Sequence, residues 1–287
     1  MILELNDLRI FTAVAEEGSM SRAASRLNYV QSNVTARIRQ MENRLGVSLF
    51  IRQSRGVNLT SSGRRLREYA LRILALATEA ERVVQEKEPL SGVLTIGSME
   101  TTAAIRLPAV LVSYHGKFPD VDLRLLTGTS EELLRKVIEF DLDAALVGGK
   151  VDHPDLFTEE VFEEELVLAS PEQWCSGKRK HTVLVFRRGC SYRERTEAWL
   201  RSEGLVPYRV MEYGSVDGII ACVRAGMGMT ALPRPLFSDI SGLRLTPLPP
   251  EIARMPTLLV RRTDSTESSA LREFVKLLKA DAALRPK

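Results

Sequence analysis

The sequence predicts an α/β protein that begins with a small helical domain and a β-hairpin and continues into lobes of alternating strands and helices. Three observations support this prediction: two short helical patterns joined by a polar turn, a heptad pattern of apolar residues between residues 63 and 88, and a strand–helix alternation after residue 92. A chain of 287 residues suits two or three domains, and a hydrophobic content of 44% supports a buried core.

Three helices are predicted before residue 47. The apolar face of the first consists of Leu5, Leu8, Phe11 and Ala15. The second begins after Ser19, a favourable N-cap residue, and ends at about Leu27. The third begins near Gln31 and stops at Gly46, because glycine suits the left-handed position that follows a helix.

The third predicted helix has two different faces. Apolar residues recur along one of them, at Val34, Ile38, Met41 and Leu45. The opposite face carries Ser32, Ala36, Arg39 and Asn43, flanked by Asn33, Thr35 and Gln40. Short hydrogen-bonding side chains and arginine suit base edges and phosphates in a DNA major groove, so this helix is the candidate recognition helix.

A β-hairpin is predicted directly after the third helix. Residues 49–52 and 57–60 read as two short strands around a turn at 53–56. Arg55 lies beside a glycine at the tip and is the candidate minor-groove contact, whereas Arg52 is the candidate phosphate contact. A helix pair followed by such a hairpin indicates a winged helix-turn-helix.

Arginine dominates the charge of this part of the chain. From Gly18 to Arg67 there are ten arginines and a single acidic residue, Glu42. Residues 1–67 carry eleven Arg against five Asp and Glu, so +6, and the remainder carries 29 Lys and Arg against 32 Asp and Glu, so −3, which together give the net charge of +3. A dense field of one sign on a helix pair and hairpin is the electrostatic footprint of nucleic-acid binding.

These residues resemble the N-terminal domain of LysR-type transcriptional regulators. The resemblance is carried by Gly18, Ser19, Ala23, Ala24, Leu27, Gln31, Ser32, Val34, Thr35, Ile38, Glu42, Leu45, Gly46, Leu49, Phe50, Arg52, Leu59, Thr60 and Gly63. It implies a sequence-specific transcription regulator that binds double-stranded promoter or operator DNA. The candidate DNA-binding residues are then Ser19, Ser21, Gln31, Ser32, Asn33, Thr35, Ala36, Arg37, Arg39, Arg52, Arg55 and Thr60.

Two positions depart from the pattern of the LysR family. Ala36 stands where the family often carries a long polar residue, so the operator sequence stays open. Met41 replaces the usual leucine and conserves its volume.

A long helix is predicted from residue 63 to about residue 88, where Pro89 ends it. Its heptad seam consists of Leu66, Ala70, Ile73, Ala77, Ala80 and Val84. The helix either lies on its own domain or pairs with a second copy, and the family resemblance favours a dimerising linker. The partners implied are then a second copy of the chain, as a homodimer or a dimer of dimers, and RNA polymerase.

The chain after residue 92 alternates between strands and helices. The first group of elements is predicted at 93–97, 102–115, 121–126, 131–140 and 144–147, which is a βαβαβ order and predicts a parallel sheet covered on both faces. An acidic run at 159–165 precedes Leu166 and is expected to form a solvated edge. A second group is predicted at 181–186, 192–203, 208–212, 216–225 and 229–232, and the chain closes with 257–261 and 268–280.

The family resemblance extends over this region and implies a two-lobed effector domain like that of periplasmic binding proteins. The stretch from Ala225 to Pro233 looks like the family's stretch in the second lobe. The expected domains are 1–60 for the winged helix-turn-helix, 61–88 for the linker and 89–287 for the effector domain. Within that domain, lobe I takes 92–161 and 256–287, and lobe II takes 162–255.

Polar residues follow the predicted strands, where ligands bind in α/β sheets. The candidate effector-binding residues are Ser98, Thr101, Thr102, Thr127, Thr129, Gly148, Ser191 and Ser215. About half of these should be plain helix caps, because Ser and Thr are favoured there in any case. Hydroxyls, backbone N–H groups and helix dipoles favour a small carboxylate or another small anion.

The sequence argues against an enzyme and against a metal or cofactor. It has no P-loop and no G-x-S-x-G, and the glycine pair 226 and 228 follows a helix and precedes a strand, the reverse of a dinucleotide motif. The histidines are isolated, and Cys175, Cys190 and Cys222 lack the C-x-x-C spacing of a metal site. We therefore expect no catalytic residues.

Two alternatives stay open. In the first, the regulator senses redox state through Cys190, which precedes a predicted helix where a thiolate is favoured. In the second, the protein is a nucleoid-type DNA protein without a ligand, against which the large two-lobed domain argues. Gel shifts with and without peroxide, and with and without small acids, separate these alternatives.

A location in the cytoplasm, on the nucleoid, is expected. Glu4 and Asp7 interrupt the apolar N-terminal run, which therefore does not read as a signal peptide. No apolar stretch approaches the roughly 20 residues needed to span a bilayer, so no membrane partner is expected.

Overall fold

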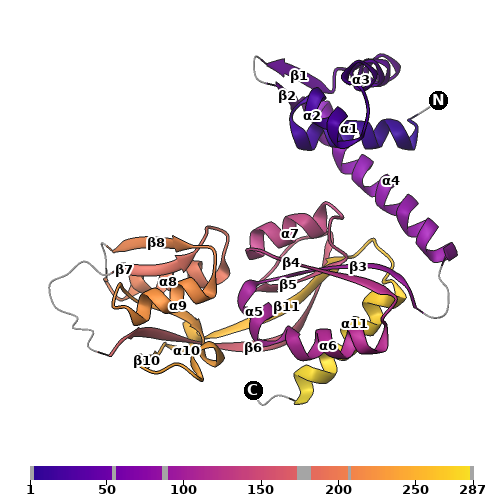
Figure 1. Ribbon diagram of the computed structural model, residues 1–287. Coiled ribbons are helices and arrows are strands. Elements are labelled where there is room, and N and C mark those ends of the chain that lie inside the picture. Colours follow the sequence, from indigo (N-terminus) through magenta and orange to yellow (C-terminus); the bar gives the residue numbers. More distant parts are fainter. Residues whose placement is uncertain (1–2, 54–55, 86–89, 173–181, 206–207, 285–287) are drawn as a thin grey trace. The chain divides into compact units, whose positions relative to one another are not determined.

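Figure 1 shows a computed structural model of the protein, which describes residues 3–53, 56–85, 90–172, 182–205 and 208–284. The chain forms two compact units, Met1–Gln85 and Glu86–Lys287. The first is helical with one hairpin, and the second contains mixed sheets with helices on both faces. In the described part of the chain, no helix is long and apolar enough to cross a membrane.

The first unit is a winged helix-turn-helix followed by a long helix. Its elements are α1 (Leu5–Glu17), α2 (Met20–Arg26), α3 (Gln31–Leu45), β1 (Phe50–Gln53), β2 (Gly56–Leu59) and α4 (Ser61–Gln85). The predicted boundaries agree within two residues, apart from the predicted end of the last helix, which lies outside the described residues. Gly18 and Gly46 both follow helices with a positive φ, and for Gly46 this confirms the predicted end of the third helix.

One core holds this unit together. It is built from apolar residues of α1, α2, α3 and the wing, among them Phe11, Ala23, Val34, Ile38 and Met41, which are all at most 2% exposed. The prediction that Leu45 shares this apolar stripe is wrong, because its side chain is 40% exposed at the end of α3. The N–H of Val57 donates to the carbonyl of Gly18 at 2.9 Å and fixes the wing against the α1–α2 turn.

The long helix α4 corrects the predicted heptad seam. Ala70 is buried and Leu66 is half-buried, and both pack into the core of their own unit. The large apolar residues that α4 exposes are Tyr69, Ile73, Leu76 and Val84. The first turns of α4 therefore lie on their own domain, so Leu66 and Ala70 leave the predicted seam, whereas its members Ile73 and Val84 are exposed.

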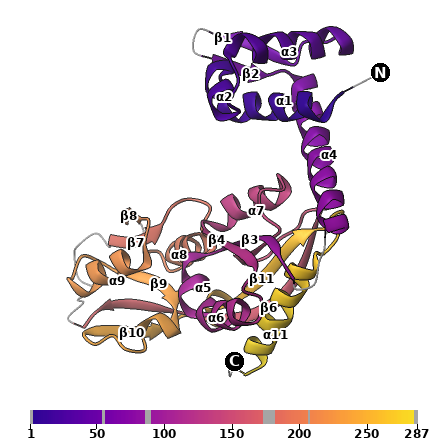
Figure 2. The same ribbon diagram turned by 45° about the vertical axis from the view of Figure 1, so that its right-hand side comes forward.

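Lobe I of the second unit contains a sheet with the strand order β4-β3-β5-β11-β6. The strands are β3 (Gly92–Ser98), β4 (Val121–Thr127), β5 (Ala144–Gly148), β6 (Leu156–Pro171) and β11 (Arg254–Arg262). Its helices are α5 (Glu100–Ile105), α6 (Leu107–Lys117), α7 (Ser130–Ile138) and α11 (Ser269–Leu284). Helices α6 and α11 pack on one face and α7 packs on the other (Figure 2).

Two predictions about lobe I need correction. The single helix expected at 102–115 is two helices that meet at Arg106, because Pro108 lacks the N–H that a continuous helix needs. The sheet is only partly parallel: β3, β4 and β5 run parallel, whereas β11 is antiparallel to both β5 and β6. Strand β5 is buried along its whole length, as a strand with both faces covered must be.

The acidic run does not form a solvated edge. It lies within β6, which pairs with β11 and then, further along, with β9 and β10. Glu164 is 2% exposed and accepts two hydrogen bonds from Arg106, at 2.9 and 3.0 Å. Buried carboxylates need such a paired cation, and a bidentate arginine is the strongest form of it.

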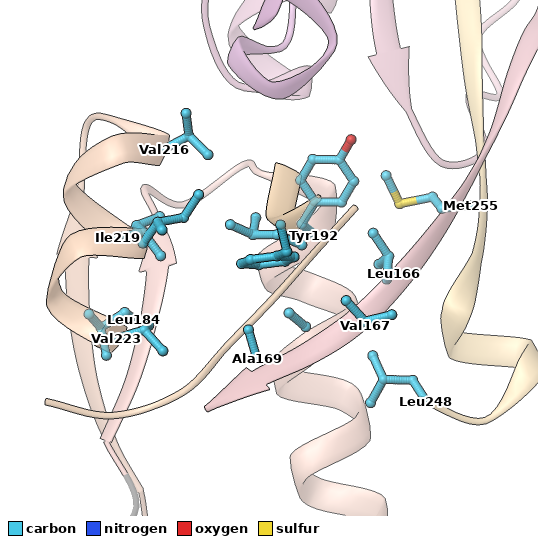
Figure 3. Close-up of a cluster of buried hydrophobic side chains, with 14 of the residues drawn as sticks. Leu166, Val167, Ala169, Leu184, Tyr192, Val216, Ile219, Val223, Leu248 and Met255 are labelled. Carbon is cyan, nitrogen blue, oxygen red and sulfur yellow. The ribbon is translucent and has the colours of Figure 1, made fainter. Parts of the chain in front are cut away.

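Lobe II is built on the second half of β6. Its further elements are β7 (Thr182–Phe186), α8 (Ser191–Ser202), β8 (Arg209–Tyr213), α9 (Val216–Arg224), β9 (Thr230–Pro233), the 3₁₀ helix η1 (Arg234–Phe237), β10 (Leu243–Pro247) and α10 (Pro250–Ala253). The sequence analysis missed β10 and α10. Figure 3 shows the core of this lobe, with the Tyr192 ring beside Leu166 and Met255 and its hydroxyl pointing away from them.

Candidate functional site

The outward face of α3 is the candidate DNA-reading surface. Ser32, Asn33, Ala36 and Arg39 are exposed, and Thr35 is half-buried beside them. Among the described residues, Arg39 makes no ion pair, so its guanidinium is available to a phosphate or a base edge. Arg52 on β1 is exposed and likewise makes no ion pair among the described residues. Arg55 lies outside the described residues.

The acidic residue nearest this surface is engaged within the protein. Glu42 Oε1 accepts the backbone N–H of Leu49 at 2.7 Å and that of Phe50 at 3.2 Å. Glu42 therefore fixes the start of the wing to α3. Its charge is directed at two backbone donors, so the arginine-rich surface keeps its positive potential.

Several other candidate DNA contacts have partners in the protein. Arg37 pairs with Asp7 at 3.2 Å and with Glu4 at 3.5 Å. The Thr60 hydroxyl donates to the carbonyl of Ser48 at 2.8 Å and accepts the N–H of Gly63. Ser19 caps α2, and Ser21 donates to the side chain of Gln31 at 2.9 Å, so these two serines hold the helix-turn-helix together.

A cavity of about 60 Å³ lies between the two lobes of the second unit. Lobe I contributes the residues that follow β3 and β4, and lobe II contributes the residues that follow β7 and β8. The lining consists of Met99, Glu100, Thr101, Thr127, Gly128, Thr129, Ser130, Phe186, Arg187, Cys190, Tyr192 and Gly214. Because the wall is drawn from strand ends and helix starts, the cavity lies where α/β sheets bind ligands.

Direct hydrogen bonds join the lobes around this cavity. Ser191 Oγ at the start of α8 donates to the carbonyl of Gly148 at 2.6 Å and lies 2.9 Å from Ser130 Oγ at the start of α7. Thr101 Oγ1 and the Tyr192 hydroxyl are 3.1 Å apart. The Thr101 hydroxyl donates to the Tyr192 hydroxyl oxygen, and burial raises the pKa of Tyr192, so that hydroxyl stays neutral.

The electrostatic potential at the cavity wall is set by the helix N-termini and by two charged residues, Glu100 and Arg187. The N–H of Thr129 donates to the Glu132 carboxylate at 3.0 Å and lowers the pKa of that carboxyl, in a reciprocal capping arrangement. Arg187 lies 3.5 Å from the same carboxylate and remains 60% exposed. Glu100 is the acidic residue in the lining, and Arg187 is the basic one.

The predicted effector residues divide into two groups. Thr101, Thr127 and Thr129 line the cavity. The others, Ser98, Thr102, Gly148, Ser191 and Ser215, lie outside the lining. Of these, Ser98 donates to the carbonyl of Met99, Ser191 and Gly148 join the lobes, and Ser215 caps α9.

Sequence reasoning missed Glu100, Arg187 and Tyr192. Each lies at a strand end or a helix start, so its position in the sequence alone marks it as a candidate ligand contact. Hydroxyl residues and glycines at strand ends are the usual signal for a ligand site, whereas these three residues are charged or aromatic. The fold was needed to show that Arg187 and Glu100, from different lobes, line one cavity.

The alternative of a reactive thiolate at Cys190 gains no support from the structure. Its side chain is 6% exposed, and this burial raises the pKa of the thiol despite N–H donors of α8 that act in the opposite direction. The described His, Cys, Asp and Glu residues form no group of three or more that could hold a metal ion.

Two protein-family models match the chain. The model described as "Bacterial regulatory helix-turn-helix protein, lysR family" matches residues 5–64, and the model "LysR substrate binding domain" matches residues 87–283. The HTH-type transcriptional regulator YusT of Bacillus subtilis (strain 168) is 44% identical over 278 residues, which cover 95% of this chain and 94% of that protein. The regulator SoxR of Arthrobacter sp. (strain TE1826) is 40% identical over 285 residues, or 96% and 97% of the two chains.

Solved structures support the same fold. ArgP from Mycobacterium tuberculosis superimposes with a TM-score of 0.71 at 19% identity and covers 98% of both chains. Full-length CbnR in complex with its target DNA gives a TM-score of 0.63 at 22% identity, with 97% of this chain and 100% of that one covered. The named relatives are transcriptional regulators and not enzymes. The chain therefore belongs to the LysR family of DNA-binding transcriptional regulators that carry a ligand-binding domain.

Proposed function

We propose that a small anionic effector binds in the cavity between the lobes and alters the regulator's action at its operator. The observation that carries this proposal is the composition of the wall, where α7 and α8 begin and Arg187 lies. Helix N-termini and guanidinium groups both favour negative charge. Because both lobes supply the wall, a bound ligand stabilises the arrangement in which the lobes face each other across it.

DNA recognition is assigned to α3 and the wing. Ser32, Asn33, Thr35 and Arg39 are proposed to read or position bases, with Ala36 leaving room for the close approach of DNA. Arg52 is proposed to bind phosphate, and the N-terminal ends of α2 and α3 are placed toward the backbone. Arg37 and Thr60 are proposed to act mainly by positioning, because both have partners within the protein.

Self-association is assigned to α4. LysR regulators form oligomers, and α4 exposes four large apolar residues at helical spacing, Tyr69, Ile73, Leu76 and Val84. A homodimer joined through this face, and a dimer of dimers built from it, would present two recognition helices to two half-sites. We place the working protein on the nucleoid, in contact with RNA polymerase at the promoters that it controls.

A thermal-shift screen of small organic acids on the full chain tests the effector proposal. A ligand present at 100 times its Kd should stabilise the folded state by about 2.7 kcal/mol. Arg187→Gln should lose most of that shift. Ser98→Ala should keep it, because Ser98 is buried and lies outside the cavity lining. A shift that survives both Arg187→Gln and Thr129→Ala would place the ligand elsewhere.

A further inference from the structure

The cavity that we assign to the effector is lined by charges of opposite sign. Glu100 comes from lobe I and Arg187 from lobe II, and they are the charged residues of the described lining. We infer that the ligand is a small zwitterion, an α-amino acid with a short side chain, rather than a simple carboxylic acid. This inference rests on the proposed effector function and narrows its chemistry.

One carboxylate oxygen of Glu100 accepts a hydrogen bond within the protein, and the other accepts none from the described residues. It is the first residue of α5 and is half-buried. Its Oε1 accepts the backbone N–H of Val216, at the start of α9 in lobe II, at 2.8 Å. Among the described residues, no donor reaches Oε2. A carboxylate oxygen without a protein donor at a cavity wall is an acceptor suited to an ammonium group.

The opposite charge offers the matching donors. The guanidinium of Arg187 carries five N–H groups, and its recorded ion pair is the contact of 3.5 Å with Glu132. The start of α7 adds the backbone N–H of Ser130, and the starts of α7 and α8 add positive dipole ends at the cavity. The N–H groups of Thr129 and Cys190 are already donated within the protein, to Glu132 and to the carbonyl of Arg187. Together these groups suit a carboxylate.

Charge and size together limit the ligand. A dicarboxylate would bring a second negative charge toward Glu100, and a neutral ligand would leave both wall charges without a partner. A volume of about 60 Å³ has room for about four water molecules, which is close to the size of glycine or alanine. Met99 and Phe186 supply an apolar wall for a short side chain.

Calorimetric titration of the full chain with matched probes tests the inference. L-Alanine is compared with propionate, which lacks the ammonium group, and with ethylamine, which lacks the carboxylate. Glycine is compared with acetate and methylamine in the same way. We expect each amino acid to bind at least tenfold more tightly than either of its truncated partners.

Variants locate the two ends of the ligand. Glu100→Gln should weaken alanine binding at least tenfold while leaving propionate binding equal or tighter, because the amide oxygen still accepts the N–H of Val216. Arg187→Gln should weaken the binding of both. Asp122→Asn makes the same charge change as Glu100→Gln on the exposed strand β4 and should alter neither affinity.

The outcomes separate the two proposals. If propionate binds as tightly as alanine, the zwitterion is wrong and the anionic effector stands. If neither the amino acids nor the carboxylic acids bind, both the zwitterion inference and the assignment of small carboxylates to this cavity are wrong. Alanine binding that survives both Glu100→Gln and Arg187→Gln would also overturn the inference, because the ligand would then lie elsewhere.

Discussion

Asp7 on α1 pairs with Arg37 on α3, with a distance of 3.2 Å between Oδ1 and Nη1. The Asp7 side chain is 2% exposed, and its other oxygen lies 3.4 Å from Arg44, two turns further along α3. One buried carboxylate therefore fastens α1 to two arginines of the recognition helix. This contact couples the orientation of α3 to the core of its domain.

Asp7→Asn should destabilise the DNA-binding unit and reduce its discrimination between sequences. We expect a loss of about 1–3 kcal/mol in the free energy of unfolding, because a buried hydrogen-bonding group loses its charged partners. Released arginines should also raise non-specific affinity and steepen the dependence of binding on salt. Denaturant unfolding and anisotropy titrations at several salt concentrations measure both effects.

Glu4→Gln is the matched control for Asp7→Asn. It removes the same charge from a carboxylate that also pairs with Arg37, but the Glu4 side chain is 59% exposed. A solvent-exposed pair contributes about 0–1 kcal/mol. Equal effects of the two substitutions would show that the buried position of Asp7 has no special role.

Arg39→Ala tests the assignment of the recognition face. If Arg39 reads a base, operator affinity should fall by about 1–3 kcal/mol and preference at one position should relax. If it binds only phosphate, the loss should be uniform across sequences and the salt slope should fall by about one. Arg9→Ala removes the same charge from the exposed side of α1 and should have a smaller effect. Unchanged binding by the Arg39 variant would exclude it from the interface.

Ile73→Asp tests the exposed face of α4. A buried and unpaired aspartate in a helix pair is strongly unfavourable, so we expect a monomer with weak operator binding. Thr78→Asp introduces the same charge at an exposed position away from that face and should leave the oligomer intact. Sedimentation velocity distinguishes the two species. A variant at Ile73 that stays dimeric would place the interface on other elements.

Gly189→Ala tests the close approach of the lobes. A Cβ at this position would lie 2.6 Å from Glu131 Oε2 and 2.8 Å from Glu131 Cβ, across the gap between the lobes. The substitution should therefore push the lobes apart and weaken effector binding. A positive φ adds about 1–2 kcal/mol of strain. Gly226→Ala is the control for backbone strain without a clash. Its φ of +86° is similar to that of Gly189, but no atom lies within 4 Å of the added Cβ. Equal losses of ligand affinity in both variants would contradict the prediction.

Cys190 should react slowly with thiol reagents. Burial raises the pKa of its thiol, so the nucleophilic thiolate is scarce at neutral pH. We expect alkylation of Cys190 to be slower than that of the half-buried Cys222, as followed by peptide mass mapping. Operator binding should not respond to peroxide. A peroxide response that disappears in Cys190→Ser would restore the redox alternative.

Local signals explain why much of the first unit could be predicted. The caps at Ser19 and Gly46 and the alternation of Val34, Ile38 and Met41 depend on neighbours within a few residues. The error in the first part of the α4 seam has a different cause. Ala70 and Ile73 follow the same heptad pattern, but only the tertiary structure determines that Ala70 is covered by its own domain.

The second unit was harder because its pairings are distant in the sequence. Glu164 reads as one acid among several, and only the fold brings Arg106, far away in the chain, against it. The cavity is also formed by residues far apart in the sequence, since Glu100 and Arg187 come from different lobes. Residue types at strand ends predicted the region of the site but not the charges that line it.

The order of elements in lobe I also has a consequence for synthesis. The ribosome makes β3, β4 and β5 early, but β11, which covers the edge of β5, and α11, which covers one sheet face, are made last. All of lobe II is made between them. A nascent chain that has not yet reached Arg254 therefore presents the open edge of a buried strand, which is a template for aggregation. We expect chains truncated before Arg254 to accumulate on chaperones or in inclusion bodies, while the DNA-binding unit at their N-terminus is already folded.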